Sequence, residues 1–175
     1  MRQFEVRRLT EHEWQIWRDV RLAALRDAPD AFHSTLEREQ AYDQARWRDM
    51  AKPAWGVKVV AFAGDSPVGV VGGYVCQEVE GAVDLFGMWV SPAARGSGVG
   101  AELVREVIAW ANERDYAEMR LWVVDGNEHA QRLYVRLGFT ATDEFSAHPR
   151  DRSARYQLMI RDLREPEMTF ERSTG

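Results

Sequence analysis

A glycine-rich loop, Arg95 to Gly100, constrains this chain more than any other feature, because it joins an apolar strand-like segment to a helix-like one. Backbone N–H groups at the start of a helix have no partner within the helix, and the helix dipole favours negative charge there. Three glycines let a ligand approach the backbone closely, and Arg95 adds a positive charge at the entrance. The loop therefore predicts a phosphate-binding turn between a strand and a helix.

Two further motifs flank this loop. The segment 85–92 before it is apolar and exits through Val-x-Pro, and the segment 127–139 after it starts at Asn127, carries Tyr134 and ends in Leu-Gly-Phe. The loop itself has the form Arg-x-x-Gly-x-Gly. In this order the three motifs, which cover about the middle third of the chain, resemble those of the GCN5-related N-acetyltransferase (GNAT) superfamily.

The resemblance implies a fold and a cofactor. The fold would be α/β, a single acyl-CoA N-acyltransferase domain whose mixed, mostly antiparallel sheet of about seven strands splays after the fourth, with helices on both faces. Acetyl-CoA would enter the splay and coenzyme A would leave as product. A bulge at Gly87 would free backbone groups for the pantetheine arm. The implied cofactor-binding residues are Met88, Trp89, Val90, Arg95, Gly96, Ser97, Gly98, Val99, Gly100, Asn127 and Tyr134.

The loop has a second interpretation. Gly96, Gly98 and Ala101 also satisfy the dinucleotide fingerprint Gly-x-Gly-x-x-Gly/Ala. That fingerprint belongs to the first unit of a parallel sheet, whereas antiparallel hairpins are expected before this loop. The chain that follows Gly100 is also short for a doubly wound domain. The pyrophosphate of coenzyme A is therefore the preferred ligand.

Acetyl transfer to an amine needs a general acid and a general base. By resemblance, Tyr134 would protonate the departing thiolate, although its spacing alone fits a core aromatic on an amphipathic helix. Asn127, likewise, has the alternative role of a plain helix cap. The family's strand-four glutamate is absent here, and the nearest acid is Asp84, which alternates with Phe86, Met88 and Val90. Either Asp84 or a chain of water molecules would take the proton of the amine.

The acceptor pocket is marked only weakly. In the resembling fold, the first two helices and the loop between the last strands form its walls, which indicates Phe32, His33, Tyr42 and Glu144. We expect direct attack by a primary amine in a ternary complex, with a small cationic acceptor of the aminoglycoside or polyamine kind. The alternatives are a protein or peptide N-terminus or lysine, and a non-catalytic acyl-CoA-binding sensor.

Composition limits the partners and the compartment. The net charge of −5 argues against a nucleic-acid binder and is compatible with a cationic substrate. The single cysteine, Cys76, excludes an intrachain disulfide framework, and neither a signal peptide nor a membrane-spanning run is evident, so we expect a cytoplasmic protein. The four histidines show no metal-ligand spacing. Homodimers occur among resembling proteins, but no interface is evident in this sequence.

Hydrophobic periodicity places the elements in one domain, 1–161, followed by a charged tail, 162–175. A capping-box pattern, Ser34 with Glu37, precedes one of the helices. A polar loop is expected over 143–153. The expected strands are 4–9, 57–63, 68–76, 84–90, 118–124, 139–141 and 155–160, and the expected helices are 11–27, 36–50, 98–114 and 127–137.

Overall fold

The computed structural model describes residues 4–165. Its strands are β1 (Glu5–Arg8), β2 (Val57–Ala63), β3 (Ser66–Val75), β4 (Ala82–Val90), β5 (Glu118–Val124), β6 (Thr140–Ala147) and β7 (Arg155–Asp162). Its α-helices are α1 (Trp14–Asp27), α2 (Leu36–Gln40), α3 (Gln44–Met50), α4 (Val99–Asn112) and α5 (Glu128–Arg136). Four short 3-10 helices are η1 (Glu11–Glu13), η2 (Pro29–Ala31), η3 (Pro53–Trp55) and η4 (Pro92–Ala94).

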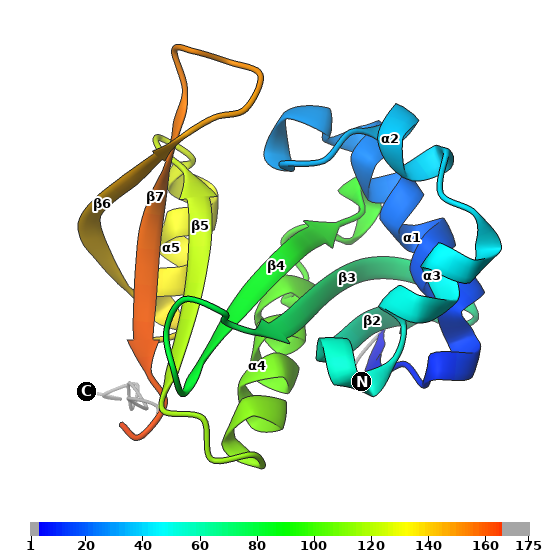
Figure 1. Ribbon diagram of the computed structural model, residues 1–175, viewed down its shortest axis with the longest axis horizontal. Helices are drawn as coiled ribbons and strands as arrows, with labels where there is room; N and C mark the ends of the chain where they lie inside the picture. Colours follow the sequence, from blue (N-terminus) through cyan, green and yellow to red (C-terminus); the bar gives the residue numbers. More distant parts are fainter. Residues whose placement is uncertain (1–3, 166–175) are drawn as a thin grey trace, which may run out of the picture.

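The strands form one seven-stranded sheet in the order β1-β2-β3-β4-β5-β7-β6. Every neighbouring pair is antiparallel except β4 and β5, which are parallel and are connected through α4. Figure 1 shows β4 and β5 starting side by side and then diverging, so that the sheet opens into two wings. The expected fold class, a mixed and mostly antiparallel sheet that splays after its fourth strand, is confirmed.

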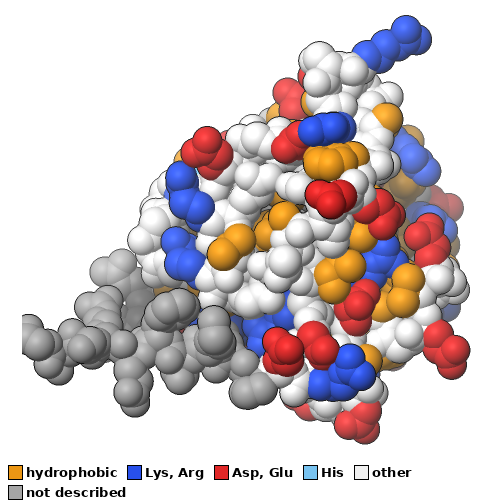
Figure 2. Space-filling model, turned by 90° about the vertical axis from the view of Figure 1, so that its left-hand side faces the viewer, with side chains coloured by type: hydrophobic (Ala, Val, Ile, Leu, Met, Phe, Trp, Pro, Cys, Tyr) orange, Lys and Arg blue, Asp and Glu red, His pale blue; other side chains and the backbone are white. Residues whose placement is uncertain are grey.

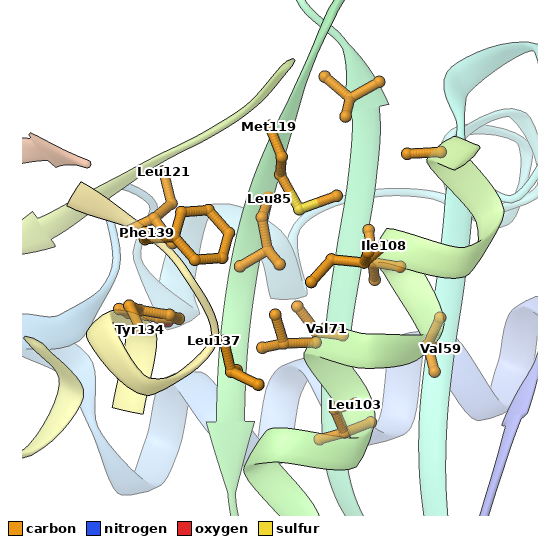
Figure 3. Packing of buried hydrophobic residues seen from close by; sticks show 14 of the residues in the cluster. Val59, Val71, Leu85, Leu103, Ile108, Met119, Leu121, Tyr134, Leu137 and Phe139 are labelled. Carbon is orange, nitrogen blue, oxygen red and sulfur yellow. The ribbon is translucent and has the colours of Figure 1, made fainter. Parts of the chain in front are cut away.

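Helices cover both faces of the sheet (Figure 1). On one face α4 and α5 bury an aliphatic core, in which Leu103 and Ile108 pack against Val71, Leu85 and Met119 (Figure 3). On the other face α1 and the helices after it bury a core rich in tryptophan, whose largest members are Trp14, Trp17, Trp47, Trp89, Phe32 and Phe62. The helical stripe of α4 and the alternation of the strands account for these two cores.

The expected helix 36–50 is wrong as a single element, because the structure contains two helices, α2 and α3, separated by residues 41–43. Asp43 causes the break by accepting a hydrogen bond from the backbone N–H of Arg46 at 2.8 Å, which caps a new helix. The first helix is capped by Thr35, whose hydroxyl accepts from the N–H of Arg38 at 3.2 Å, so the expected capping box at Ser34 is also wrong.

The strand expected over 139–141 continues as β6 to Ala147, which shortens the expected polar loop to residues 148–154. The pairing of β6 with β7 shifts register between Ala141 and Phe145, and this irregular stretch contains the polar residues that resembled a loop. At the other end β7 includes Asp162, and Leu163 is buried in the core. The remainder of the expected tail, 166–175, lies outside the described residues.

The surface on the β6 side mixes acidic and basic side chains with scattered apolar ones (Figure 2). Phe145 on this edge strand is 38% exposed, and the guanidinium of Arg155 lies 3.7 Å from its ring centroid. Charged residues on an exposed edge strand disfavour pairing with another chain. Among the helices of residues 4–165, none combines the length and the apolar character needed to cross a membrane.

Candidate active site

A cavity of about 460 Å³ occupies the split between β4 and β5. The two strands pair from Ala82 opposite Glu118 to Leu85 opposite Leu121, and the pairing then stops. Beyond that point, residues of both strands line the cavity together with the glycine-rich loop, α5 and the segment after α1. The divergence of the strands therefore creates the cavity, which passes from one face of the sheet to the other.

Strand β4 contains a β-bulge at the point where its residues line the cavity. Phe86 pairs with Gly72 on β3 and Trp89 pairs with Val70, so that Gly87 and Met88 together stand opposite the single residue Val71. Gly87 has φ +65°, and a side chain there would collide with the guanidinium of Arg21. The bulge expected at this glycine is thus present, and it reverses the alternation of the strand after Phe86.

The glycine-rich loop forms one end of the cavity. Gly98 is the N-cap of α4 with φ +90°, a conformation that L-residues with side chains rarely adopt. The first helical hydrogen bond runs from the N–H of Glu102 to the C=O of Gly98, so the N–H groups of residues 99–101 have no helical acceptor. No atom lies within 4 Å of the side-chain position of Gly98. The loop therefore offers an open cradle of backbone donors that fits a phosphate group.

Arg95 and Ser97 brace this loop. The guanidinium of Arg95 donates to Asp27 Oδ2 at 2.6 Å and to the C=O of Val90 at 3.0 Å. The hydroxyl of Ser97 donates to the C=O of Ala94 at 2.6 Å and does not line the cavity. These two side chains fix the shape of the turn, while its backbone faces the cavity.

Asp27, the last residue of α1, joins three elements. Its Oδ2 accepts from the indole N–H of Trp89 on β4 at 2.9 Å as well as from Arg95. These donors, the indole first, hold the pKa of Asp27 below its usual range. Neither Asp27 nor this contact was predicted from the sequence, because its partners lie more than sixty positions away.

Helix α5 supplies Asn127 and Tyr134 to the cavity wall. Asn127 is the N-cap, and its side-chain oxygen accepts from the N–H of Ala130 at 3.2 Å. Tyr134 is buried and packs edge-to-face against Phe139, with ring centroids 5.8 Å apart. Figure 3 shows Tyr134, Leu137 and Phe139 grouped beside Leu121 and Leu85. Burial raises the pKa of Tyr134, so its hydroxyl stays protonated.

Asp84 is not among the residues that line the cavity. It pairs with Tyr74 on β3 and Arg120 on β5, on the face of the sheet to which Phe86 also belongs. The expectation that Asp84 shares a face with Met88 and Val90 is wrong, because the bulge moves those two side chains to the α4 face. Burial raises the pKa of the Asp84 carboxyl.

Of the four expected acceptor residues, only Phe32 lines the cavity. His33 is next to it and stacks on Tyr156 at 4.3 Å, and desolvation lowers its pKa. Tyr42 packs against Trp47 in the helical layer, and Glu144 lies exposed on β6. The lining residues that the sequence did not indicate include Ala28, Ala31, Phe86, Trp122, Val124, His129 and Arg136. Strand alternation could have indicated Trp122, since its neighbours Leu121 and Val123 face the aliphatic core.

A network of hydrogen bonds supports the segment after α1, of which Phe32 lines the cavity. The guanidinium of Arg150 donates to the backbone C=O groups of Pro29, Phe32 and His33 at 2.7–2.9 Å. His148 Nε2 contacts the C=O of Asp30 at 3.1 Å. The loop 148–154 is thereby tied to the segment after α1, and both loops lie near each other in Figure 1. Across residues 4–165, no group of three His, Cys, Asp or Glu side chains could hold a metal ion.

Comparison with known proteins identifies the family. A family model described as the acetyltransferase (GNAT) family matches residues 9–139, so the chain belongs to this family. Acetyl-CoA, the cofactor expected from the sequence, is the cofactor of the family. The cradle of backbone donors and the split beside it fit such a ligand.

Curated relatives agree with this assignment. The mycothiol acetyltransferase of Thermobispora bispora is 31% identical over 130 residues, which are 72% of this chain and 42% of that protein. The thialysine N-epsilon-acetyltransferase of Bos taurus is 35% identical over 54 residues, 31% of this chain and 32% of that protein. The chain thus spans less than half the length of these relatives.

Solved structures share the fold. A GNAT-family acetyltransferase of Streptococcus pneumoniae superposes with a TM-score of 0.73 at 17% identity and covers 91% of this chain and 99% of its own. The yncA protein of Salmonella typhimurium, solved with acetyl-CoA, has a TM-score of 0.73 at 17% identity. The match covers 94% of this chain and 96% of that protein. At these identities the likeness concerns the fold alone.

Proposed function

We propose that this protein is an N-acetyltransferase that moves the acetyl group of acetyl-CoA to the primary amine of a small molecule. The observation that carries the proposal is the cavity through the β4–β5 split, which has the glycine-rich loop at one end and Tyr134 in its wall. Its volume of about 460 Å³ is in the range of small-molecule sites. Family membership and the acetyl-CoA-bound neighbour support the choice of cofactor.

In this proposal the chain holds acetyl-CoA mainly through its backbone. The N–H groups at the start of α4 bind the pyrophosphate, because they have no helical acceptor and lie at the positive end of the helix dipole. The unpaired edge of β4 around Met88 and Val90 takes the pantetheine arm as an extra strand. Acetyl-CoA supplies the thioester, and the bulged strand orients it in the split.

Tyr134 is the proposed general acid. The amine nitrogen bonds to the acetyl carbon as the carbon–sulfur bond breaks, and the departing sulfur takes the tyrosine proton. In water a phenol, near ~10, is a weaker acid than a thiol, near ~8.5. The transfer therefore depends on the pocket, where desolvation of the thiolate raises the pKa of the leaving thiol as well. Burial keeps Tyr134 protonated until that moment.

Asp84 is the proposed base, acting through intervening water. It is half-buried on the face of β4 that carries Phe86, and Phe86 reaches the cavity. Burial raises the pKa of its carboxyl, which brings it closer to the value that suits a base at neutral pH. The proton of an attacking ammonium would pass along this face of the sheet.

The experiment is thiol release from acetyl-CoA in the presence of primary amines, with Tyr134→Phe as the test variant. We expect Tyr134→Phe to lower kcat by about 10²–10⁴-fold while the Kd for acetyl-CoA stays unchanged. Tyr116→Phe is the matched control, since Tyr116 stacks on Trp110 outside the cavity.

Two results would contradict the proposal. Full kcat in Tyr134→Phe would exclude tyrosine as the acid. Binding of acetyl-CoA without thiol release for any amine would instead indicate a non-catalytic acyl-CoA-binding module.

A further inference from the structure

The cavity has two halves on opposite faces of the sheet. Met88 and Val90 contact the α4 core, and the glycine-rich loop and α5 lie on that side. Phe86 belongs to the α1 core, and Trp122 alternates with residues that face α4, so both point to the opposite face. We call these the cofactor half and the acceptor half. An amine that attacks a thioester held in the split arrives from the acceptor half.

The acceptor half is apolar throughout. Its side chains come from the segment after α1, from β4 and from β5, and they are Ala28, Ala31, Phe32, Phe86, Trp122 and Val124. Among all cavity-lining residues within 4–165, none is aspartate or glutamate. Trp122 is only partly buried, and it lines the cavity. Such a wall stabilises an apolar ligand body and offers no carboxylate to a second ammonium group. The rings of Phe32 and Phe86 already have Arg21 and Lys58 as cation–π partners.

Asp84, on this face of the sheet, is the proposed base for the reacting amine, and two further carboxylates near this half are already engaged. Glu39 forms a two-point ion pair with Arg21 at 2.8 and 2.9 Å, and both side chains are buried. Asp27 accepts from Arg95 and Trp89. Neither carboxylate is free to receive a second charge from the acceptor.

A buried positive charge lies next to Phe86, outside the residues that line the cavity. Lys58 is buried, and its ammonium lies 5.4 Å from the ring centroid of Phe86. A second cation brought onto Phe86 would meet this ammonium in a poorly hydrated site, where like charges repel strongly. The acceptor half therefore repels polycations through the charge of Lys58, and it also lacks a carboxylate that could pair with them.

We infer that the acceptor is a monoamine with an apolar or aromatic body, which the acceptor half holds against Phe32, Phe86 and Trp122. The inference rests on the proposed function and narrows its substrate class. It differs from the polyamine or aminoglycoside expected from the net charge, because the charge of the whole chain does not describe this cavity. The reacting ammonium is the only charge that the acceptor brings.

The test compares two amines of matched length. n-Hexylamine and cadaverine (1,5-diaminopentane) differ only in that a terminal methyl replaces a second ammonium. With the full chain and saturating acetyl-CoA, we expect kcat/KM for n-hexylamine to exceed that for cadaverine by at least ~10-fold, because cadaverine must bury an unpaired charge. 2-Phenylethylamine is the aromatic probe and should be at least as good as n-hexylamine.

Trp122→Ala tests the wall itself. It should lower kcat/KM for 2-phenylethylamine by about 10-fold, mostly through KM, and leave the Kd for acetyl-CoA within about twofold. Trp122→Phe should restore most of the loss, since it keeps an aromatic face. Trp55→Ala is the control, because Trp55 is 54% exposed and does not line the cavity.

The outcomes separate this inference from the proposed function. Equal or better turnover of cadaverine would overturn the monoamine inference while leaving acetyl transfer intact. An unchanged kcat/KM in Trp122→Ala would also overturn it. Thiol release with none of the amines, while acetyl-CoA still raises the melting temperature, would overturn both.

Discussion

The two halves of the cavity are built by different means. The cofactor half consists of backbone donors at the start of α4 and of the bulged edge of β4, and glycines give a ligand access to that backbone. The acceptor half consists of apolar side chains that three distant segments bring together. A site that binds its ligand through backbone groups needs glycines at fixed spacing, and these form a motif that can be recognised in the sequence. A site built from side chains of distant segments has no such motif.

The largest effect should come from breaking the buried ion pair behind the acceptor half. Arg21→Met leaves Glu39 buried without its partner, which should cost about 3–5 kcal/mol of unfolding free energy. Urea titration measures this loss. The guanidinium of Arg21 also lies 4.8 Å from the ring centroid of Phe32, so the acceptor wall should loosen more than the phosphate loop.

The control for this variant is Arg21→Met combined with Glu39→Leu. Removing both charges together should recover most of the lost stability, because the cost arises from the unpaired carboxylate. A single variant that lost less than about 1 kcal/mol would show that the pair is not a structural support of the acceptor half.

A smaller effect on the free energy of unfolding, of opposite sign, is expected when Lys58, which lies next to Phe86, is replaced. Burial lowers the pKa of this lysine to about 8. Below about pH 8 the Lys58 side chain of the folded protein is a buried ammonium group. As the pH rises from about 8 to 10.5, the folded state loses its proton before the unfolded state does, so stability rises.

Lys58→Met should therefore stabilise the chain at pH 7 by up to about 3 kcal/mol, and the gain should vanish near pH 10.5. Urea titrations of both proteins at the two pH values measure the difference. A gain that did not depend on pH would assign the effect to packing and not to charge.

The smallest expected effect concerns the cofactor half and comes from replacing one of two glycines by alanine. Gly98 and Gly64 both have positive φ, and neither has an atom within 4 Å of its side-chain position. Each substitution by alanine should cost about 1–2 kcal/mol of stability through backbone strain. Only Gly98→Ala should also weaken acetyl-CoA binding, which calorimetry can measure, because only Gly98 lies in the phosphate cradle. Equal loss of affinity in Gly64→Ala would contradict a local role for the loop.

The sequence predicted most of the fold because periodicity and motif order carried it. The segment 85–139 indicated the splayed sheet, and the glycine at position 87 indicated the bulge. The break between α2 and α3 was missed because a single capping side chain, Asp43, outweighs a continuous helical pattern. The length of β6 was missed because an edge strand tolerates polar residues.

The acceptor half could not be predicted in the same way. Simple strand alternation predicted that Met88 would lie on the same face of the sheet as Phe86. In the structure a one-residue bulge moves Met88 to the opposite face. Phe32 and Trp122 are ninety residues apart in sequence, and nothing local marks either as a cavity wall. Only the tertiary packing of the segment after α1 onto β4 and β5 brings them together.

The position of Asp27 has a consequence for the order in which substrates bind. Its carboxylate accepts from Arg95 in the phosphate loop and from Trp89 on β4, and Ala28, the next residue, begins the acceptor wall. A phosphate that draws Arg95 toward itself removes one of the two donors that fix this end of α1. In the proposed function the entrance for the amine would therefore respond to the cofactor, and acetyl-CoA would add before the amine.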